Sequence, residues 1–167
     1  MKKFIIVLGI IFIVSQSVFA TELQGGISYT VDSAREYIQQ GQVNDIGPQG
    51  HLYYDGNSYN ADVIYGYNSN NVPIGFDVRF KDDLTISYTY GMDNRLRSIA
   101  KYDKPSDTYP HRGYIYNTGG KLIKTTLMVS KNNGFAFTPN GKLITHMVNG
   151  IGYLGNTNII VYRQSGY

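Results

Sequence analysis

The chain has 167 residues, a formal net charge of +3 and no cysteine, which allows one domain with a hydrophobic core but not two. The absence of cysteine excludes disulfide bonds, thiol catalysis, cysteine-based metal sites and a lipid anchor on an N-terminal cysteine. Charged residues make up only 16%, and 16 Tyr and 19 Gly stand beside no Trp, a composition that favours short strands joined by tight turns.

The first 20 residues have the pattern of a secretory signal peptide. Two lysines precede an apolar run at 4–14, and Val18 and Ala20 fit a cleavage site before Thr21. The apolar run is too short to cross a bilayer, which takes ~20 residues. We therefore predict an exported chain of 147 residues with no integral membrane span after cleavage, destined for the periplasm, the cell surface or the extracellular space. An uncleaved N-terminal anchor is the alternative.

Cleavage also changes the charge. Without the two leading lysines, 13 basic residues remain against 12 acidic ones, so the net charge falls to +1. A near-neutral surface lacks the basic patch that nucleic-acid binding requires. We expect no nucleic-acid partner.

The segment after the cleavage site holds one helical pattern. Residues 21–29 show no periodicity and are predicted to form a leader or a short edge strand. Residues 30–41 place Val31, Ala34 and Ile38 on one face of a helix, which we expect to dock at one end of a sheet. The candidate N-terminal caps are Ser33 paired with Glu36, Thr30 and Asp32, and the expected stop is Gly41.

Beyond Leu52 the hydrophobic period changes to two. The clearest case is a hairpin in which 76–80 and 84–90 alternate apolar and polar residues on either side of a turn at Asp82 and Asp83. We predict that 42–167 forms a single, mainly β domain. Its architecture is expected to be consecutive antiparallel hairpins in a twisted sheet or an open barrel-like meander.

An internal repeat organises these hairpins. Its unit is two aromatic residues two positions apart, three turn residues, Gly or Asn, a basic residue and Leu. The copies are 88–96, 114–122 and 135–143, and a fainter one begins at Tyr65 and Tyr67. The two aromatic residues share one strand face, and the Leu returns to that face after the turn. One such hairpin cannot bury its own apolar face, so neighbours must pair.

The stretches Tyr116-Asn-Thr-Gly-Gly-Lys-Leu122 and Phe137-Thr-Pro-Asn-Gly-Lys-Leu143, with Asn-Gly again at 133–134 and 149–150, resemble the variant MORN repeat. They are also similar to the YD repeats of large secreted proteins. The resemblance implies a row of twisted hairpins with a scaffolding or protein-binding role, and some members of that class are described as antitoxin-like. The chain departs from the pattern at Phe135, where Trp or Tyr is usual, and in 152–162, which lacks Asn-Gly-Lys-Leu.

The sequence offers no set of catalytic residues. The three histidines, His51, His111 and His146, have no metal-ligand spacing, and there is no nucleophile elbow or phosphate-binding loop. Oxygen ligands between Asp55 and Asp62 resemble a calcium loop but lack its closing Glu. We therefore expect no enzyme, no metal and no cofactor. A hydrolase built on His111 or His146 is the remaining enzymatic alternative.

Two groups of residues are candidates for binding. The longest loop, 103–112, carries Tyr109, His111 and Arg112, and long loops on rigid sheets collect binding residues. The second group is the tyrosine cluster, because exposed Tyr rows stack on sugars or form protein interfaces. Its members are Tyr53, Tyr54, Tyr65 and Tyr67.

These observations predict an exported envelope binding or scaffold module that acts through its Tyr-rich sheet surface and the 103–112 loop. An immunity protein of the antitoxin-like kind is one version of it. The expected partner is another protein, or alternatively a cell-envelope glycan bound by a carbohydrate-binding module. The other alternative is a small outer-membrane β-barrel, although the best alternating run, 84–90, is shorter than the ~9–11 residues that a membrane strand requires.

Overall fold

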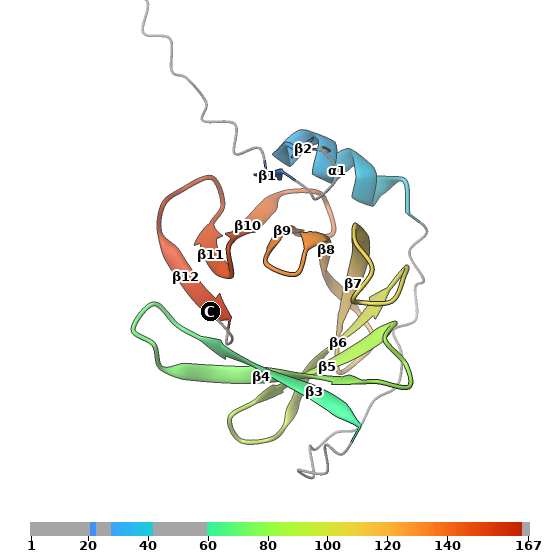
Figure 1. Ribbon diagram of the computed structural model, residues 1–167, viewed down its shortest axis with the longest axis vertical. Coiled ribbons are helices and arrows are strands. Elements are labelled where there is room, and N and C mark those ends of the chain that lie inside the picture. The colour runs from blue at the N-terminus through green and yellow to red at the C-terminus, as the bar shows by residue number, and fades with distance from the viewer. Residues whose placement is uncertain (1–20, 23–27, 42–59, 165–167) are drawn as a thin grey trace, which may run out of the picture.

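The computed structural model describes residues 21–22, 28–41 and 60–164 (Figure 1). In this part of the chain, the elements are β1 (Thr21–Glu22), β2 (Ser28–Tyr29), α1 (Val31–Gln39), β3 (Ala61–Tyr67), β4 (Pro73–Phe80), β5 (Ile86–Gly91), β6 (Leu96–Tyr102), β7 (His111–Asn117), β8 (Leu122–Ser130), β9 (Asn133–Phe137), β10 (Leu143–Val148), β11 (Ile151–Leu154) and β12 (Ile160–Gln164). The predicted class, mainly β with one short N-terminal helix, is confirmed. The predicted signal peptide, Tyr53 and Tyr54 lie outside the described residues.

The ten strands β3–β12 form one antiparallel meander that closes into a barrel (Figure 1). Each strand pairs with its successor in the chain, and closure comes from β12 pairing with β3. That last contact is short, with Arg163 opposite Tyr67 and Gln164 opposite Gly66. The expected row of hairpins therefore adopts the closed form of the meander.

Four hairpin turns, at 68–72, 91–95, 117–121 and 138–142, share one geometry. In each, the first N–H donates to the fifth carbonyl at 2.8–2.9 Å and the fourth N–H donates to the first carbonyl at 2.9–3.0 Å. The fourth residue has a positive φ between 59° and 84°, which Asn and Gly tolerate best. The residues in this position are Asn71, Asn94, Gly120 and Gly141. The repeat, including its fainter copy, is thus a structural unit.

The aromatic and leucine positions of the repeat meet across each hairpin. Three cross-strand pairs carry this contact, and each sits at a shift in register: Tyr90 with Leu96, Tyr116 with Leu122, and Phe137 with Leu143. An extra residue on one strand increases the local twist. A repeated bulge of this kind curves the meander in one direction, as a closed barrel requires.

The second strand of the predicted 76–90 hairpin begins later than the alternation predicts. The Asp83 carboxylate accepts a hydrogen bond from the Thr85 N–H at 2.9 Å, which holds 83–85 in a turn. Strand β5 therefore starts at Ile86 rather than at Leu84. The hydrogen bonds from Thr85 lower the pKa of Asp83, as expected of a carboxylate that closes a turn.

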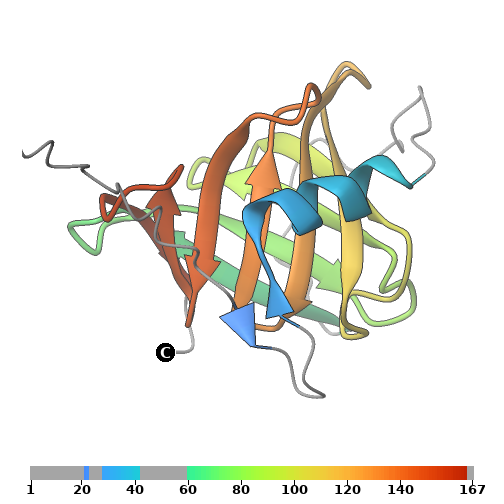
Figure 2. The same ribbon diagram turned by 90° about the horizontal axis from the view of Figure 1, so that it is seen from above.

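Helix α1 begins at the Thr30 cap, one of the rival candidates, and Thr30 forms its capping box with Ser33 rather than Ser33 with Glu36. The helix docks on the outer side of the barrel and not at one end of the sheet, as Figure 2 shows. Its buried Ala34 and Ile38 pack on an outward apolar cluster from β8 and β9. The strand members of that cluster are Leu127, Val129, Phe135 and Phe137.

A second outward cluster covers the wall from β3 to β6. Its central members, Val78 and Tyr90, are 0% and 1% exposed. The aromatic rings stack across strands, with the Phe76 and Tyr90 ring centroids 5.6 Å apart. The remaining buried members are Leu96 and Ile99. Both apolar clusters therefore lie on the outside of the barrel, and the alternate positions of the same strands face its interior.

Candidate ligand-binding cavity

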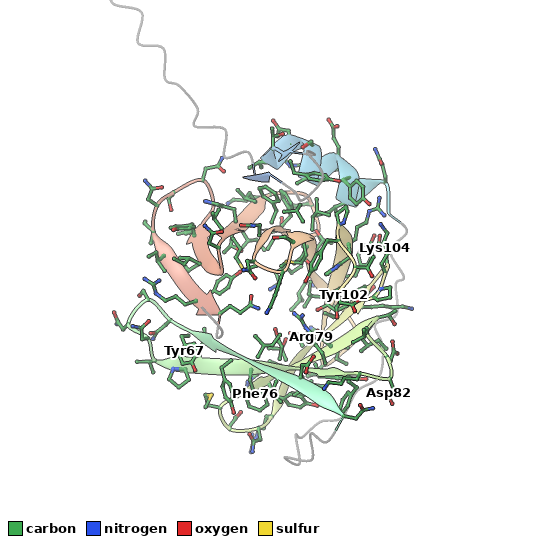
Figure 3. The ribbon with its side chains drawn as sticks, viewed as in Figure 1. Tyr67, Phe76, Arg79, Asp82, Tyr102 and Lys104 are labelled. Carbon is green, nitrogen blue, oxygen red and sulfur yellow. The ribbon has the colours of Figure 1, made fainter. Side chains whose placement is uncertain are left out.

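The barrel interior holds a cavity of about 400 Å³. Because side chains alternate along a strand, the side chains between the outward aromatic residues project into the cavity, and Phe76, Tyr90 and Phe135 also border it. On β4 the inward residues are Gly75, Asp77 and Arg79, and Figure 3 shows Arg79 projecting into the interior while Phe76 lies on the other side of the strand.

Apolar residues such as Ile115 and Met147 share this lining with many polar side chains. The polar side chains come from strands all around the barrel: Ser87, Thr89, Ser98, Tyr102, Lys124, Thr126, Thr145, Tyr162 and Gln164. Some of them bond to one another. The Thr89 hydroxyl donates to the Asp77 carboxylate at 2.7 Å, and the Ser87 and Tyr102 hydroxyls lie 2.8 Å apart. Burial raises the pKa of Tyr162 to about 12, so this phenol is neutral near pH 7.

Arg79 is the cavity residue with an unmet hydrogen-bonding group. Its Nε is buried and makes no hydrogen bond. The four ion pairs found among the described residues do not include Arg79. Arg79 as a whole is half-buried, but its Nε–H is removed from water without an acceptor, which is unfavourable.

His111 faces the same cavity from the start of β7 and is 2% exposed. Its ring stacks on Tyr109 with centroids 5.2 Å apart, and it meets Tyr102 edge-on at 5.0 Å. Its Nδ1 lies 3.0 Å from the Thr108 carbonyl oxygen, which can only accept, so Nδ1 carries the proton. Burial, together with the positive charge of Arg79, lowers the pKa of His111, which keeps the ring neutral near pH 7 and leaves Nε2 as an acceptor.

The 103–112 loop is an ordered part of the cavity wall. The Ser106 N–H donates to the Leu84 carbonyl at 2.8 Å, and the Lys104 ammonium donates to the Pro110 carbonyl at 3.1 Å. Ser106 and Tyr109 contribute to the lining beside His111. Two of the three loop residues predicted to bind, Tyr109 and His111, therefore stand together at the cavity.

Arg112, the third loop residue predicted to bind, points away from the cavity. It follows His111 directly in β7, and successive side chains of a strand point to opposite faces. On the outward face its guanidinium bonds the Asp103 carboxylate at 2.8 Å and the Tyr37 carbonyl at 2.7 Å. It also lies 4.0 Å above the centre of the Tyr37 ring. Arg112 thus ties α1 and the loop to the barrel and does not reach the cavity.

The described tyrosines of the predicted binding surface do not form one exposed row. Tyr65 is 40% exposed and packs against Phe76 on the outward face, with ring centroids 5.6 Å apart. Tyr67 is half-buried at the short contact between β3 and β12. Many other tyrosines of the repeat, such as Tyr90 and Tyr116, are buried in outward packing.

The two described histidines do not share a site. His146 is 4% exposed on the outward face of β10, where it stacks on Tyr153 with ring centroids 5.1 Å apart. This agrees with its interpretation as a packed sheet residue. His111 and His146 lie on opposite faces of the barrel wall, so they cannot act together at one site.

Sequence reasoning missed Asp77, Arg79 and Lys124. Asp77 and Arg79 alternate with apolar residues on the predicted 76–80 strand, and the sequence did not show which way that polar face points. The signal that could have found them is the recurrence of polar residues on the alternate face of successive strands, since a closed sheet brings those faces together.

In the described part of the chain, no group of three or more His, Asp and Glu side chains could hold a metal ion. No helix there is long and apolar enough to cross a membrane. No protein-family model, curated protein or solved structure matches the chain.

Proposed function

We propose that the protein is an exported binding protein that takes up a small polar molecule in the interior of its barrel. The observation that carries this proposal is the closed barrel, whose interior holds a cavity of about 400 Å³ with many polar side chains in its lining. Ligand cavities in proteins typically measure ~300–1,000 Å³. A small barrel that serves only as a core fills its interior with packed apolar side chains.

The position of the apolar residues supports this proposal. Val78 and Leu127, from the two outward clusters, are both 0% exposed. Burial of these clusters supplies the hydrophobic stabilisation that a core usually provides. The interior is then free to hold polar groups for a ligand.

The loop supports it as well. Ser106, Tyr109 and His111 reach the cavity from one connection between neighbouring strands. The predicted role of the 103–112 loop in binding thus becomes a role in closing the cavity wall.

A variant whose cavity is filled by a larger side chain tests the proposal. Ala100 lines the cavity and is 6% exposed, so Ala100→Phe places a ring in the space for the ligand. Wild-type protein dialysed against a bacterial extract of compounds below 1 kDa, and read by mass spectrometry, is expected to retain a polar compound that Ala100→Phe loses.

The matched control is Ile123→Phe, which adds a ring at an outward position that is 42% exposed and is expected to retain the compound. Thermal melting confirms that each variant is folded. Equal retention by wild type and Ala100→Phe, or no retention by either, would remove the cavity as the site.

An outer-membrane barrel is the second candidate, because polar residues inside and apolar residues outside are also the membrane-barrel pattern. The burial of both outward clusters favours the first proposal, since a lipid-facing band must be exposed. Cell fractionation decides between them. Recovery of the protein only in detergent would favour the membrane alternative.

An immunity protein would need a protein partner. One exposed apolar patch favours such a partner. Val72, Ile74 and Met92 are each 50–53% exposed beside Tyr65. The patch spans two turns that the Gly75–Gly91 pairing brings together. Met92→Glu, at a position that does not line the cavity, would weaken such a complex and leave uptake of a small molecule unchanged, which separates the two functions.

A further inference from the structure

The barrel interior has an excess of positive charge. Its lining includes two half-buried cations, Arg79 and Lys124, and a single carboxylate, Asp77, while two further lining cations, Arg97 and Lys131, are exposed to solvent. Arg97 is neutralised by Asp93, whose carboxylate lies 2.6 Å away. Asp77 is already bonded to the Thr89 hydroxyl. Asp77 keeps its negative charge and balances at most one of the remaining cations, so the lining has a net positive charge that favours an anion.

Arg79 locates where that anion binds. A guanidinium N–H that is buried without an acceptor is unfavourable, and an incoming oxygen anion relieves it. The planar guanidinium matches a carboxylate with two parallel hydrogen bonds. Because Arg79 projects from the middle of the cavity wall (Figure 3), a group bound to it lies inside the barrel.

The rest of the lining fits hydroxyl groups. Ser98, Thr126 and Thr145 line the cavity from three strands and can each donate or accept. The neutral His111 adds an acceptor at Nε2, because its Nδ1 proton faces the Thr108 carbonyl. A ligand with several hydroxyls would find partners on every side of the barrel.

We propose that the cavity binds a small hydroxylated carboxylate, with its carboxylate on the Arg79 guanidinium and its hydroxyls on the surrounding Ser and Thr side chains. This assignment rests on the proposed function of the barrel interior. In this site, a single residue, Arg79, selects the charge of the ligand.

Four probes with the same sugar ring test the assignment: glucuronate, glucose, glucosamine and glucose 6-phosphate. The protein is dialysed against their equimolar mixture and retention is read by mass spectrometry. Wild-type protein is expected to retain glucuronate at least about tenfold better than glucose, the minimum effect of one charged hydrogen-bonded pair. Preferential retention of glucose, glucosamine or glucose 6-phosphate, or retention of none, overturns the assignment.

Variants of Arg79 then test whether this residue is responsible for the preference for glucuronate. Arg79→Gln is expected to lose the preference for glucuronate, and Arg79→Lys to keep part of it, because Lys retains the charge but not the paired geometry. Lys101→Gln, which removes a charge from the outward face of β6, is expected to leave the preference unchanged. An Arg79→Gln protein that still prefers glucuronate overturns the role of Arg79.

The melting temperature of Arg79→Gln distinguishes a binding role of Arg79 from a structural role, because the two roles predict changes in opposite directions. Because its Nε has no partner, Arg79→Gln is expected to melt at the same temperature as wild type or higher. A clear fall in melting temperature shows that Arg79 supports the fold and overturns the assignment. Loss of extract binding in Ala100→Phe, with no effect of Arg79→Gln, keeps the cavity and removes the carboxylate.

Discussion

The two faces of the barrel wall differ sharply, although the same strands supply both. On β8, Leu127 and Val129 are buried outward beneath α1, while Lys124 and Thr126 line the cavity. The outward face packs as a core does and holds the barrel together. The inward face carries many polar side chains among its apolar ones and surrounds a cavity. In this fold, stability and binding are thus separated by the alternation of a strand.

The first prediction breaks the outward face. Phe137 is 1% exposed and contacts Phe135 and the guanidinium of Arg35. Phe137→Ala should lower the free energy of unfolding by about 3–5 kcal/mol, because it removes a buried ring and leaves a cavity. The inward Thr126→Ala should cost less than about 1 kcal/mol. Urea denaturation measures both, and equal losses would contradict the separation of the two faces.

The second prediction concerns Arg112, which stands next to a cavity residue but faces outward. Arg112→Ala should cost about 1.5–3 kcal/mol, because it removes charged hydrogen bonds to Asp103 and to the Tyr37 carbonyl. It should leave ligand uptake unchanged in folded protein. Lost uptake at a temperature where the variant is fully folded would place Arg112 in the site after all.

The third prediction concerns helix α1, which covers part of the outward face. Thr30 accepts a hydrogen bond from the Ser33 N–H at 3.1 Å and caps α1. Thr30→Ala should lower the free energy of unfolding by about 1 kcal/mol, and Thr30→Asp should restore most of it. Both are read by urea denaturation. An unstable Thr30→Asp variant would show that the cap is not what Thr30 contributes.

The fourth prediction concerns pH and tests the inward face. Burial lowers the pKa of His111 in the folded protein, so below its ordinary value of about 6.5 the unfolded chain takes up a proton first. Stability is therefore full above that pH and falls as the pH drops toward the folded pKa, by at most about 1.4 kcal/mol per unit.

Thermal melts between pH 5 and 8 measure this slope. His111→Gln should flatten it relative to wild type, since Gln does not titrate. An unchanged slope would assign the pH dependence to other groups.

The helix and the hairpins could be predicted because their signals are local. Val31, Ala34 and Ile38 share a helix face whatever lies opposite, and the Gly or Asn of each turn is required by its positive φ. Of the site, the loop pair Tyr109 and His111 was found from sequence. Arg79 was not, because an alternating polar residue looks the same whether it faces solvent or the inside of a closed sheet.

The sequence alone determined the strands, the repeated turns and which residues share a face, because these depend on backbone geometry and a period of two. Tertiary structure decided which face is inside. Closure rests on the pairing of β12 with β3, between segments at opposite ends of the meander, and on α1 covering the outer wall. Once the sheet closes, the polar residues of separate strands converge on one cavity. No local pattern specifies that convergence, because it depends on contacts between residues about a hundred positions apart.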